Sequence, residues 1–495
     1  MLQGLPGSTL QGMNPRESGR LLWISLGLGL IPLLGWWLTG LFDLDEGFYA
    51  AIVGEMLRRG EWITPYYNGE PWFEKPILLY WVTMPSVLAF GEWFGPRLPS
   101  VLASLGLYAV VFRAARAQWG DAAAVWSVGV LSTSLLMVGL GRMMMTDALF
   151  ALSLAGAFLL WYRGFNPVLS GLAVGLAVLA KGPAGIVLFG GVILIYAALE
   201  PSARRGLLGR IVVGLVGMAA VVALWYVPCY LANRETFVQE FLIKQNWQRF
   251  LGGDKAHGVP LWAHPIYFPL ILLVGMFPWS VAGVRALRAG WKGDPFSRFL
   301  VIWFGVIFLF FTVSGSKLPH YILPAVPALA LLIGRELSLR TVWKGRPRGE
   351  EPSQGVGPFA IAAPVVCLLA NLVFWAHYHG KFGADSHAEV HRAAILAREA
   401  GGPVATYQLS RRSADLGTGQ LRIQETSHPS FIFYLRSTTV DAESPEDLRS
   451  IPKPFWIFTR PDRVASLEPL KAEGWTFVPQ VLPGTKGDYV LLKVR

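Results

Sequence analysis

The residues best suited to chemistry lie in an acidic, aromatic stretch that runs from Asp43 to Lys75 between two strongly apolar segments. A carboxylate next to a bilayer loses hydration and contributes nothing to anchoring, so a cluster of carboxylates there needs a reason. The reason that fits these residue types is chemistry at the membrane surface. The carboxylates concerned are Asp43, Asp45, Glu46, Glu55 and Glu74.

Asp45 and Glu46 directly follow the first apolar segment, where a carboxylate can act as a general base or orient a nucleophile. The alternative is that Asp45 caps a helix. The run Trp72-Phe73-Glu74-Lys75-Pro76 in the same stretch favours the chemical interpretation. A Lys and a Glu beside a proline and aromatic rings suit an anionic lipid head group, although a lone Lys at such a boundary also snorkels to lipid phosphates.

Two further segments carry polar residues at the ends of apolar runs. Asp147, in GRMMMTDALF, begins such a run and is either a helix cap or a substrate contact. The loop KQNWQRFLGGDKAHG carries several cations, among them Arg249, together with His257 and the pair Gly252-Gly253. A basic loop with glycines suggests phosphate recognition, and its alternative is a solvated charged face.

A third segment, SGSKLPHYILP, repeats the cation, proline and aromatic arrangement found around Lys75. Lys317, His320 and Tyr321 are therefore candidates for the same phosphate site. The histidines of the chain lack the HExxH or CxxC framework of a zinc site, so no metal ligand is predicted. Outer carboxylates holding a divalent ion together with water are the alternative.

Composition assigns the chain to the polytopic membrane proteins. Hydrophobic residues make up 53% of the sequence and charged residues 15%, against roughly 25% charged residues in a soluble domain. Apolar runs long enough to cross a bilayer recur from Leu21 to Ala376. The net charge of +11 comes from basic clusters spaced as loops would be, which indicates the positive-inside rule and not a nucleic-acid partner.

Placing the basic clusters in the cytoplasm predicts about eleven membrane-spanning helices and a cytoplasmic N-terminus. The run 77–90 is short for a span, and counting it would move every later basic cluster outside, so we expect it at the interface, within an outer loop 42–96. That loop, Asp147, the basic loop and the C-terminal region then share the periplasmic side. The expected spans are 21–41, 97–115, 121–140, 147–163, 167–181, 183–199, 211–231, 263–285, 298–314, 319–337 and 358–376.

Two domains are predicted, a transmembrane domain at 1–376 and a small soluble α/β domain at 377–495. In the second, Ser444-Pro445-Glu446-Asp447 has the N-cap, first-turn proline and acids that begin a helix. Within the 42–96 loop, the apolar spacing of 47–60 predicts an amphipathic helix that lies on the membrane surface and ends at Gly60. The strand-like runs of the second domain are 404–409, 455–459, 476–481 and 489–494.

Taken in order, the motifs resemble the GT-C glycosyltransferases of the protein O-mannosyltransferase superfamily, in the branch of the aminoarabinose lipid A transferases. The resemblance covers most of the chain before the C-terminal domain. It rests on DEGFYAAIVGEMLRRGEWITPYYNGEPWFEKPILLYW, followed by RMMMTDALF, AVLAKGPAG, NWQRF, FPW and SGSKLPHYILP. Such enzymes take a sugar from a polyprenyl phosphate, such as undecaprenyl phosphate, and pass it to an acceptor at the outer face of the inner membrane.

The resemblance implies a membrane-embedded transferase in which cations balance the charge of the departing phosphate and carboxylates orient the acceptor. A direct displacement of this kind inverts the anomeric carbon. The catalytic residues it implies are Asp45, Glu74 and Asp147. The implied substrate-binding residues are Glu46, Trp72, Lys75, Arg249, His257, Lys317 and Tyr321.

The chain departs from the family pattern at Phe48, where Arg is common, and at Trp72, where Tyr is common. The sugar is therefore open, and so is the acceptor, a lipid or a cell-surface glycan. One rival is a protein O-mannosyltransferase that acts on exported Ser or Thr. Another is a transporter of lipid-linked sugars, but transporters place their key polar groups near the bilayer midplane, whereas here they gather at one face.

Overall fold

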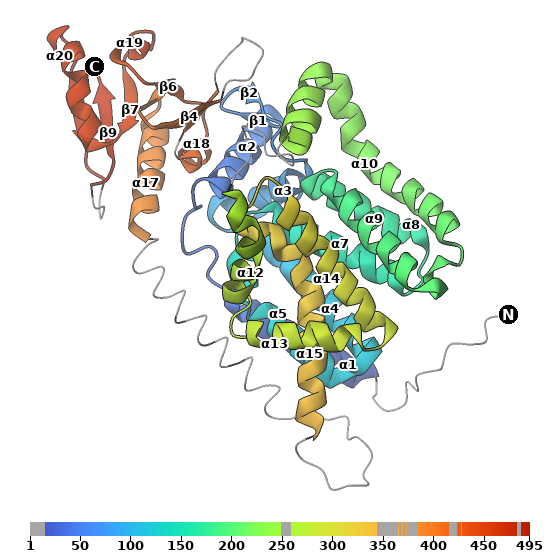
Figure 1. The fold of residues 1–495 in the computed structure, drawn as a ribbon. Helices are drawn as coiled ribbons and strands as arrows, with labels where there is room; N and C mark the ends of the chain where they lie inside the picture. The colour runs from blue at the N-terminus through green and yellow to red at the C-terminus, as the bar shows by residue number, and fades with distance from the viewer. Residues whose placement is uncertain are drawn as a thin grey trace.

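The computed structural model describes residues 15–248, 259–343, 384–414, 423–426, 428–482 and 487–495, together with Val365, Leu369 and Val373. Up to residue 343 the described chain is a body of packed helices. The C-terminal residues form a separate layer of strands and helices against one end of this body (Figure 1).

Side-chain N-caps followed by proline mark the starts of two helices in the body. Asn166 accepts a hydrogen bond from the backbone N of Val168 ahead of α8, and Asp294 accepts one from that of Ser297 ahead of α14; in both cases a proline follows the cap. The principal helices are α1 (Pro15–Leu30), α4 (Leu98–Trp119), α5 (Asp121–Ser132), α6 (Leu135–Leu140), α7 (Thr146–Tyr162), α8 (Pro167–Lys181), α9 (Ala184–Leu199), α10 (Leu207–Phe237), α12 (His264–Gly275), α13 (Ser280–Trp291), α14 (Pro295–Val313) and α15 (Val326–Trp343). A π-helix (Val238–Gln248) continues α10, and the 3-10 helix η5 (Pro319–Ala325) precedes α15.

Several of these helices have the apolar character expected of membrane spans. Within the described residues, four are long and apolar enough to cross a bilayer, and α12 with α13 adds a fifth if the bent pair is one span. The four are Leu98–Trp119, Leu207–Gln248, Pro295–Val313 and Pro319–Leu339. Shorter apolar helices occupy the places of most other predicted spans. The number of crossings remains a prediction, and the expected span 358–376 lies almost wholly outside the described residues.

Three expected spans are interrupted in the structure. In the one at 121–140, α5 ends at Ser132 and α6 begins at Leu135. In the segment 21–41 the helical residues end at Leu33, because Pro32 and then Gly35, which has a φ of 79°, interrupt the helix. The span expected at 263–285 is not one continuous helix. It is divided into α12 and α13, whose axes differ by 112°, at a turn that contains Pro278.

The helix ends that carry the predicted cytoplasmic clusters lie together. The indole N–H of Trp119, at the end of α4, donates to Asp294 at 3.3 Å, and Arg335 of α15 lies 3.5 Å from the same carboxylate. Arg298, in the first turn of α14, pairs with Glu200 at the end of α9. These contacts agree with a common side for these loops, away from the end that carries the 42–96 loop.

The 42–96 loop is itself structured. It contains α2 (Asp45–Arg59), β1 (Tyr66–Tyr67), β2 (Glu70–Pro71) and α3 (Leu78–Phe94). The predicted end of α2 is confirmed, because Gly60 adopts the left-handed conformation with a φ of 65°. The location of α2 on the membrane surface stays a prediction. Residues all round α2, including Glu55, are buried, since a C-terminal helix packs against it.

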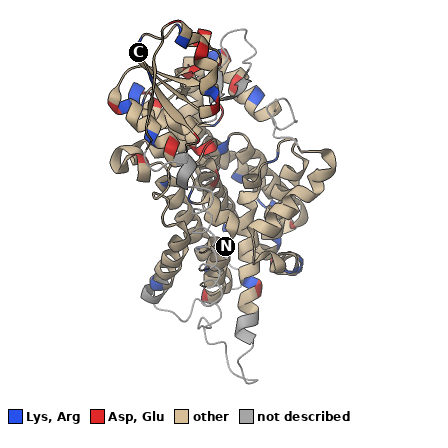
Figure 2. Ribbon diagram, turned by 90° about the vertical axis from the view of Figure 1, so that its left-hand side faces the viewer, with Lys and Arg blue, Asp and Glu red and all other residues tan. Residues whose placement is uncertain are grey.

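The C-terminal unit is a small α/β layer with helices α17 (Ala384–Ala400), α18 (Pro429–Leu435), α19 (Pro445–Leu448) and α20 (Glu468–Ala472). The four predicted strands are confirmed, as is the predicted helix start at Ser444, where Ser444 and Asp447 form a capping box ahead of α19. Charged residues are denser on this unit than on the helices (Figure 2). Its sheet has the order β6 (Val440–Ala442), β3 (Val404–Tyr407), β7 (Phe455–Thr459), β9 (Val490–Val494) and β8 (Phe477–Gln480), and β4 (Ser410–Ala414) pairs separately with β5 (Ile423–Thr426).

Candidate active site

A pocket of about 470 Å³ lies where the 42–96 loop meets the helical body. Its walls come from α2, the segment after β2, the facing ends of α7, α8 and α9, the π-helix, the end of α14 and η5. The polar lining residues include Asp45, Tyr49, Glu74, Lys75, Lys181, Asn246, His320 and Tyr321. The apolar lining residues include Val187, Phe241, Leu242, Phe310 and Phe311. Several sequence-predicted residues therefore meet in one cavity.

Asp45 is the first residue of α2, and its side chain lines the pocket. Leu44 occupies the N-cap position, so Asp45 is not the helix cap that the alternative interpretation requires. An acid in the first turn still stabilises the helix dipole. The first turn of α2 thus fixes the backbone of Asp45, whose carboxylate lies at the pocket wall.

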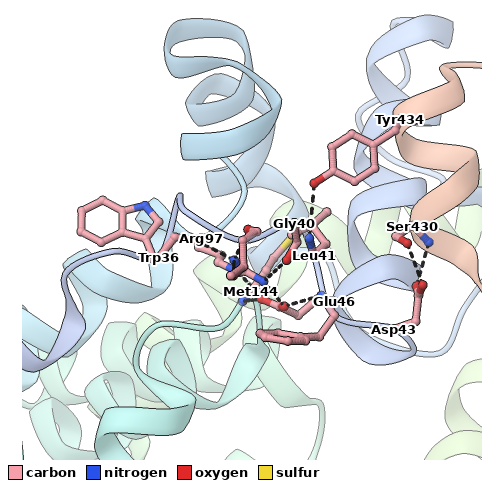
Figure 3. A network of polar contacts seen from close by, with 11 residues as sticks. Trp36, Gly40, Leu41, Asp43, Glu46, Arg97, Met144, Ser430 and Tyr434 are labelled. Carbon is pink, nitrogen blue, oxygen red and sulfur yellow. Dashed lines mark hydrogen bonds and ion pairs between the residues drawn. The ribbon is translucent and has the colours of Figure 1, made fainter. Parts of the chain in front are cut away.

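Glu46 does not line the pocket but lies in a buried polar network (Figure 3). One carboxylate oxygen accepts hydrogen bonds from Arg97 Nε at 2.8 Å and from the backbone N of Met144 at 2.6 Å. The other accepts from Arg97 Nη2 at 2.6 Å and from the backbone N of Phe42 at 2.9 Å. Arg97 also donates to the carbonyl of Gly40. Glu46 thus connects the chain before α2, the start of α4 and the loop before α7, and its predicted substrate contact stays a prediction.

Glu74 and Lys75 both line the pocket and pair with each other. Lys75 Nζ donates to Glu74 Oε1 at 2.8 Å, and both side chains are partly exposed to the cavity. Pro76 follows and fixes φ at that point of the chain. The carboxylate of Glu74 thus holds the ammonium group of Lys75 in position at the pocket.

Asp147 lies in the first turn of α7 and forms an ion pair with Lys181, the last residue of α8. The Lys181 Nζ to Asp147 Oδ1 distance is 2.5 Å, and the Asp147 side chain is 1% exposed. Asp147 does not itself line the pocket, whereas Lys181 does. The ammonium of Lys181 also lies 4.8 Å from the centroid of the Tyr321 ring. Asp147 therefore influences the pocket indirectly, by holding the ammonium group of Lys181 at its wall.

Gly182 allows the π-helix to approach the end of α8. Its φ is 79°, and a Cβ atom added there would lie 2.7 Å from Oδ1 of Asn246. Asn246 lines the pocket and donates to the carbonyl of Phe241 at 2.7 Å. A larger residue at position 182 would displace this wall of the cavity.

Sequence reasoning did not single out Tyr49, Lys181 or Asn246 as site residues. Lys181 carried a usable signal, because it ends an apolar run at the same side as Asp147, and a charge at such a position is costly. Tyr49 looks like an ordinary aromatic residue of an amphipathic helix. Asn246 belongs to a loop that drew attention only through its cations.

Trp72 is 8% exposed and does not line the pocket. It stacks on Phe48, with ring centroids 5.7 Å apart and an interplanar angle of 9°, and it also contacts Tyr67. Trp72 therefore packs against the loop outside this pocket, and its predicted substrate contact stays a prediction. Phe48 and Trp72 are the two positions at which the chain departs from the family pattern. Because their rings stack, the two departures belong to the same apolar contact.

Lys317 is buried at the end of α14, where its Nζ donates to the carbonyls of Thr312 at 2.9 Å and Ser314 at 2.5 Å. It stabilises the helix C-terminus and does not line the pocket. Burial lowers the pKa of Lys317. Arg249 and His257 lie outside the described residues.

The two lysines at the pocket, Lys75 and Lys181, each form an ion pair with a carboxylate. Burial, together with the charge of Asp45, raises the pKa of Tyr49 well above its usual range, so this hydroxyl remains protonated. Within the described part of the chain, no three His, Cys, Asp or Glu side chains gather as a metal site would require. Glu74 and Asp147 are each paired with a lysine instead.

Residues 74–229 match the family described as "Dolichyl-phosphate-mannose-protein mannosyltransferase". An undecaprenyl phosphate-alpha-4-amino-4-deoxy-L-arabinose arabinosyl transferase of Pseudomonas paraeruginosa is 34% identical over 351 residues, which cover 66% of this chain and 61% of that protein. The predicted resemblance is confirmed. The transferase of the same name from Pectobacterium carotovorum is 32% identical over 343 residues and 60% of its length. The chain thus matches about three fifths of the length of these relatives.

Solved structures share the fold over nearly the whole chain. ArnT from Cupriavidus metallidurans bound to undecaprenyl phosphate gives a TM-score of 0.70 at 21% identity, covering 97% of this chain and 98% of that one. Its apo state gives 0.73 over the same coverage. The oligosaccharyltransferase AglB from Archaeoglobus fulgidus gives 0.57 at 12% identity, covering 96% and 74%. The chain therefore has a helical, ArnT-like fold.

Proposed function

We propose that this chain transfers a sugar from a polyprenyl-phosphate donor to a lipid A-like lipid or a cell-surface glycan at the periplasmic face of a bacterial inner membrane. The proposal rests on the side chains that line one pocket. The ammonium groups of Lys75 and Lys181 line the same cavity as the carboxylate of Asp45 and an apolar wall.

The donor site is proposed from charge and apolarity together. Two ammonium groups suit the phosphate, and Phe310, Phe311 and Val187 suit the first prenyl units of its chain. The names of the relatives and of the ArnT structure refer to undecaprenyl phosphate, which has both parts. Glu74 and Asp147 would hold the two lysines in place.

In the proposed reaction an acceptor oxygen attacks the anomeric carbon while the bond from that carbon to the phosphate oxygen breaks. The polyprenyl phosphate leaves with the electron pair, and Lys75 and Lys181 stabilise the charge that grows on it. Asp45 orients the acceptor and takes the proton of a hydroxyl acceptor; an ionised phosphate acceptor has no proton to give. One displacement inverts the anomeric centre.

The proposed membrane placement puts the pocket and the C-terminal unit in the periplasm and the N-terminus in the cytoplasm. In support, the basic helix ends lie at the opposite end of the helical body, as the positive-inside rule requires. About eleven crossings within 1–376 and a soluble domain at 377–495 complete the proposal.

A protein O-mannosyltransferase is the second candidate, because the matched family carries that description. The experiment that separates the two offers radiolabelled undecaprenyl-phosphate sugars to the purified full chain in detergent, with total membrane lipid and a Ser/Thr-rich peptide as separate acceptors. Label in lipid supports the proposal, and label in peptide supports the alternative. Absence of Asp45-dependent label in both contradicts a transferase of either kind.

A further inference from the structure

The C-terminal unit contacts the 42–96 loop at the turn that precedes Asp45. Asp43 accepts hydrogen bonds from the backbone N of Ser430 at 2.9 Å and from its Oγ at 2.7 Å (Figure 3). His428 Nδ1 lies 3.3 Å from the same carboxylate, and its Nε2 lies 2.6 Å from the hydroxyl of Tyr489. The Asp43 side chain is 5% exposed, so water competes little for these contacts.

The backbone on both sides of Asp43 touches α18. A Cβ atom added to Gly47 would lie 2.1 Å from Asp43 Oδ1 and 2.6 Å from the backbone N of Ser430. On the other side, the backbone N of Leu41 donates to the hydroxyl of Tyr434 at 3.3 Å (Figure 3). The turn and the first residues of α2 are therefore held at close range by the C-terminal unit.

A second contact joins the same unit to the β1–β2 hairpin, which leads to the pocket residues Glu74 and Lys75. Asn68, at the tip of the hairpin, donates from Nδ2 to the carbonyl of Thr439 at 3.1 Å. The backbone N of Thr439 donates back to Asn68 Oδ1 at 2.8 Å. Asp43, at the start of the acidic stretch, and Asn68, in its hairpin, are thus both attached to the C-terminal unit.

Asp45 lies between two residues that are fixed from different directions. Asp43 is bound by the C-terminal unit, and Glu46 is bound by Arg97 and the backbone of Met144 in the helical body. Neither neighbour can move without breaking buried hydrogen bonds, which makes the position of the intervening carboxylate dependent on both.

We propose that Asp43 is a positioning residue, through which the C-terminal unit fixes Asp45 in the pocket. This inference rests on the proposed transfer reaction and gives the C-terminal unit a role in it. A displacement of a reacting group by about 1 Å costs on the order of 100-fold in rate, so loss of this tie lowers turnover without removing any group that touches the substrate.

The test compares Asp43→Ala with a matched control in the full chain. Asp43→Ala lowers kcat by about 10- to 100-fold and leaves the KM for the donor within about threefold. Asp43→Asn retains at least about a third of kcat, because its amide can still accept from and donate to Ser430. In the control, Glu92→Gln weakens contacts of α3 with Arg398 and Arg436 of the same unit, yet kcat stays within about twofold.

A second readout does not depend on transfer. Hydrogen exchange of the amides at 43–49 is faster in Asp43→Ala by about tenfold or more and unchanged in Glu92→Gln. Wild-type exchange and kcat in Asp43→Ala, or an equal fall of kcat in Glu92→Gln, would overturn the inference. If the wild-type chain transfers no sugar, the proposed function fails, and the exchange measurement still decides whether Asp43 holds the turn.

Discussion

Lys181 Nζ lies 2.5 Å from Asp147 Oδ1 and joins the last residue of α8 to the first turn of α7. The two side chains are 12% and 1% exposed, so the ion pair is largely withdrawn from water. Because Lys181 also lines the pocket, one contact serves both the packing of two helices and the charge of the cavity. Removing either partner leaves a buried charge without compensation.

Substitution of Lys181 by Met is expected to lower the free energy of unfolding by roughly 3 to 5 kcal/mol, since Asp147 loses its partner. The melting temperature of the detergent-solubilised chain measures this. The double variant Asp147→Asn/Lys181→Met is the control, which regains most of the stability but not the affinity for undecaprenyl phosphate. A single variant as stable as the wild type would show that the pair contributes nothing to the fold.

Substitution of Lys75 by Gln is expected to weaken undecaprenyl phosphate binding by roughly 10- to 100-fold, the loss of one charge-assisted hydrogen bond. Titration followed by intrinsic tryptophan fluorescence gives the Kd. Lys471→Gln removes an exposed lysine that pairs with Glu468 in α20 and leaves the Kd unchanged. Equal affinities of Lys75→Gln and wild type would remove Lys75 from the phosphate site.

Glu46→Gln separates a structural carboxylate from a substrate-binding one. Arg97 would remain buried without its counter-charge, so the free energy of unfolding falls by roughly 3 to 5 kcal/mol. The folded fraction should bind undecaprenyl phosphate with the Kd of the wild type, because Glu46 does not line the pocket. A stable Glu46→Gln variant with weakened binding would support the substrate contact predicted from the sequence.

Much of the site was predictable, because charge at the end of an apolar run is costly and therefore informative. That rule selected Asp45, Glu74 and Lys75, which line one pocket together with Tyr321, a residue predicted from the cation, proline and aromatic arrangement of its segment. It also selected Lys317, which instead caps α14. A charged residue at the end of an apolar run can either line a binding pocket, as Lys75 does, or cap a helix, as Lys317 does. Spacing along the chain does not distinguish these two roles.

Contacts between distant segments account for the burial of α2 and for the position of Trp72. The pattern of α2 predicts one apolar face, but contacts from the C-terminal unit cover the other, as the docking of Ser430 on Asp43 shows. Similarly, the stacking of Trp72 on Phe48 depends on the β1–β2 hairpin, which sequence periodicity does not reveal. Contacts between segments nearly 400 residues apart leave no local signal in one sequence.

The C-terminal unit should be less stable at neutral pH than in mild acid because of Asp441. Burial raises the pKa of Asp441 to about 6 from its ordinary 3.8. Between these values the folded form holds more protons than the unfolded form, so the free energy of unfolding falls as pH rises, by roughly 3 kcal/mol in total. Asp441→Asn removes this slope in melts between pH 4 and 8, and exposed Asp462→Asn leaves it. An unchanged slope in Asp441→Asn would contradict the assignment.

Asp45 is proposed to act on the acceptor in a pocket that binds a lipid-linked sugar. The most direct measurement is single-turnover transfer from undecaprenyl-phosphate sugar by wild type and Asp45→Asn, with donor affinity determined on the same samples. We expect Asp45→Asn to lower the transfer rate by about 100-fold or more and to leave the donor Kd within about threefold of the wild-type value. Transfer by Asp45→Asn at the wild-type rate would contradict this proposal.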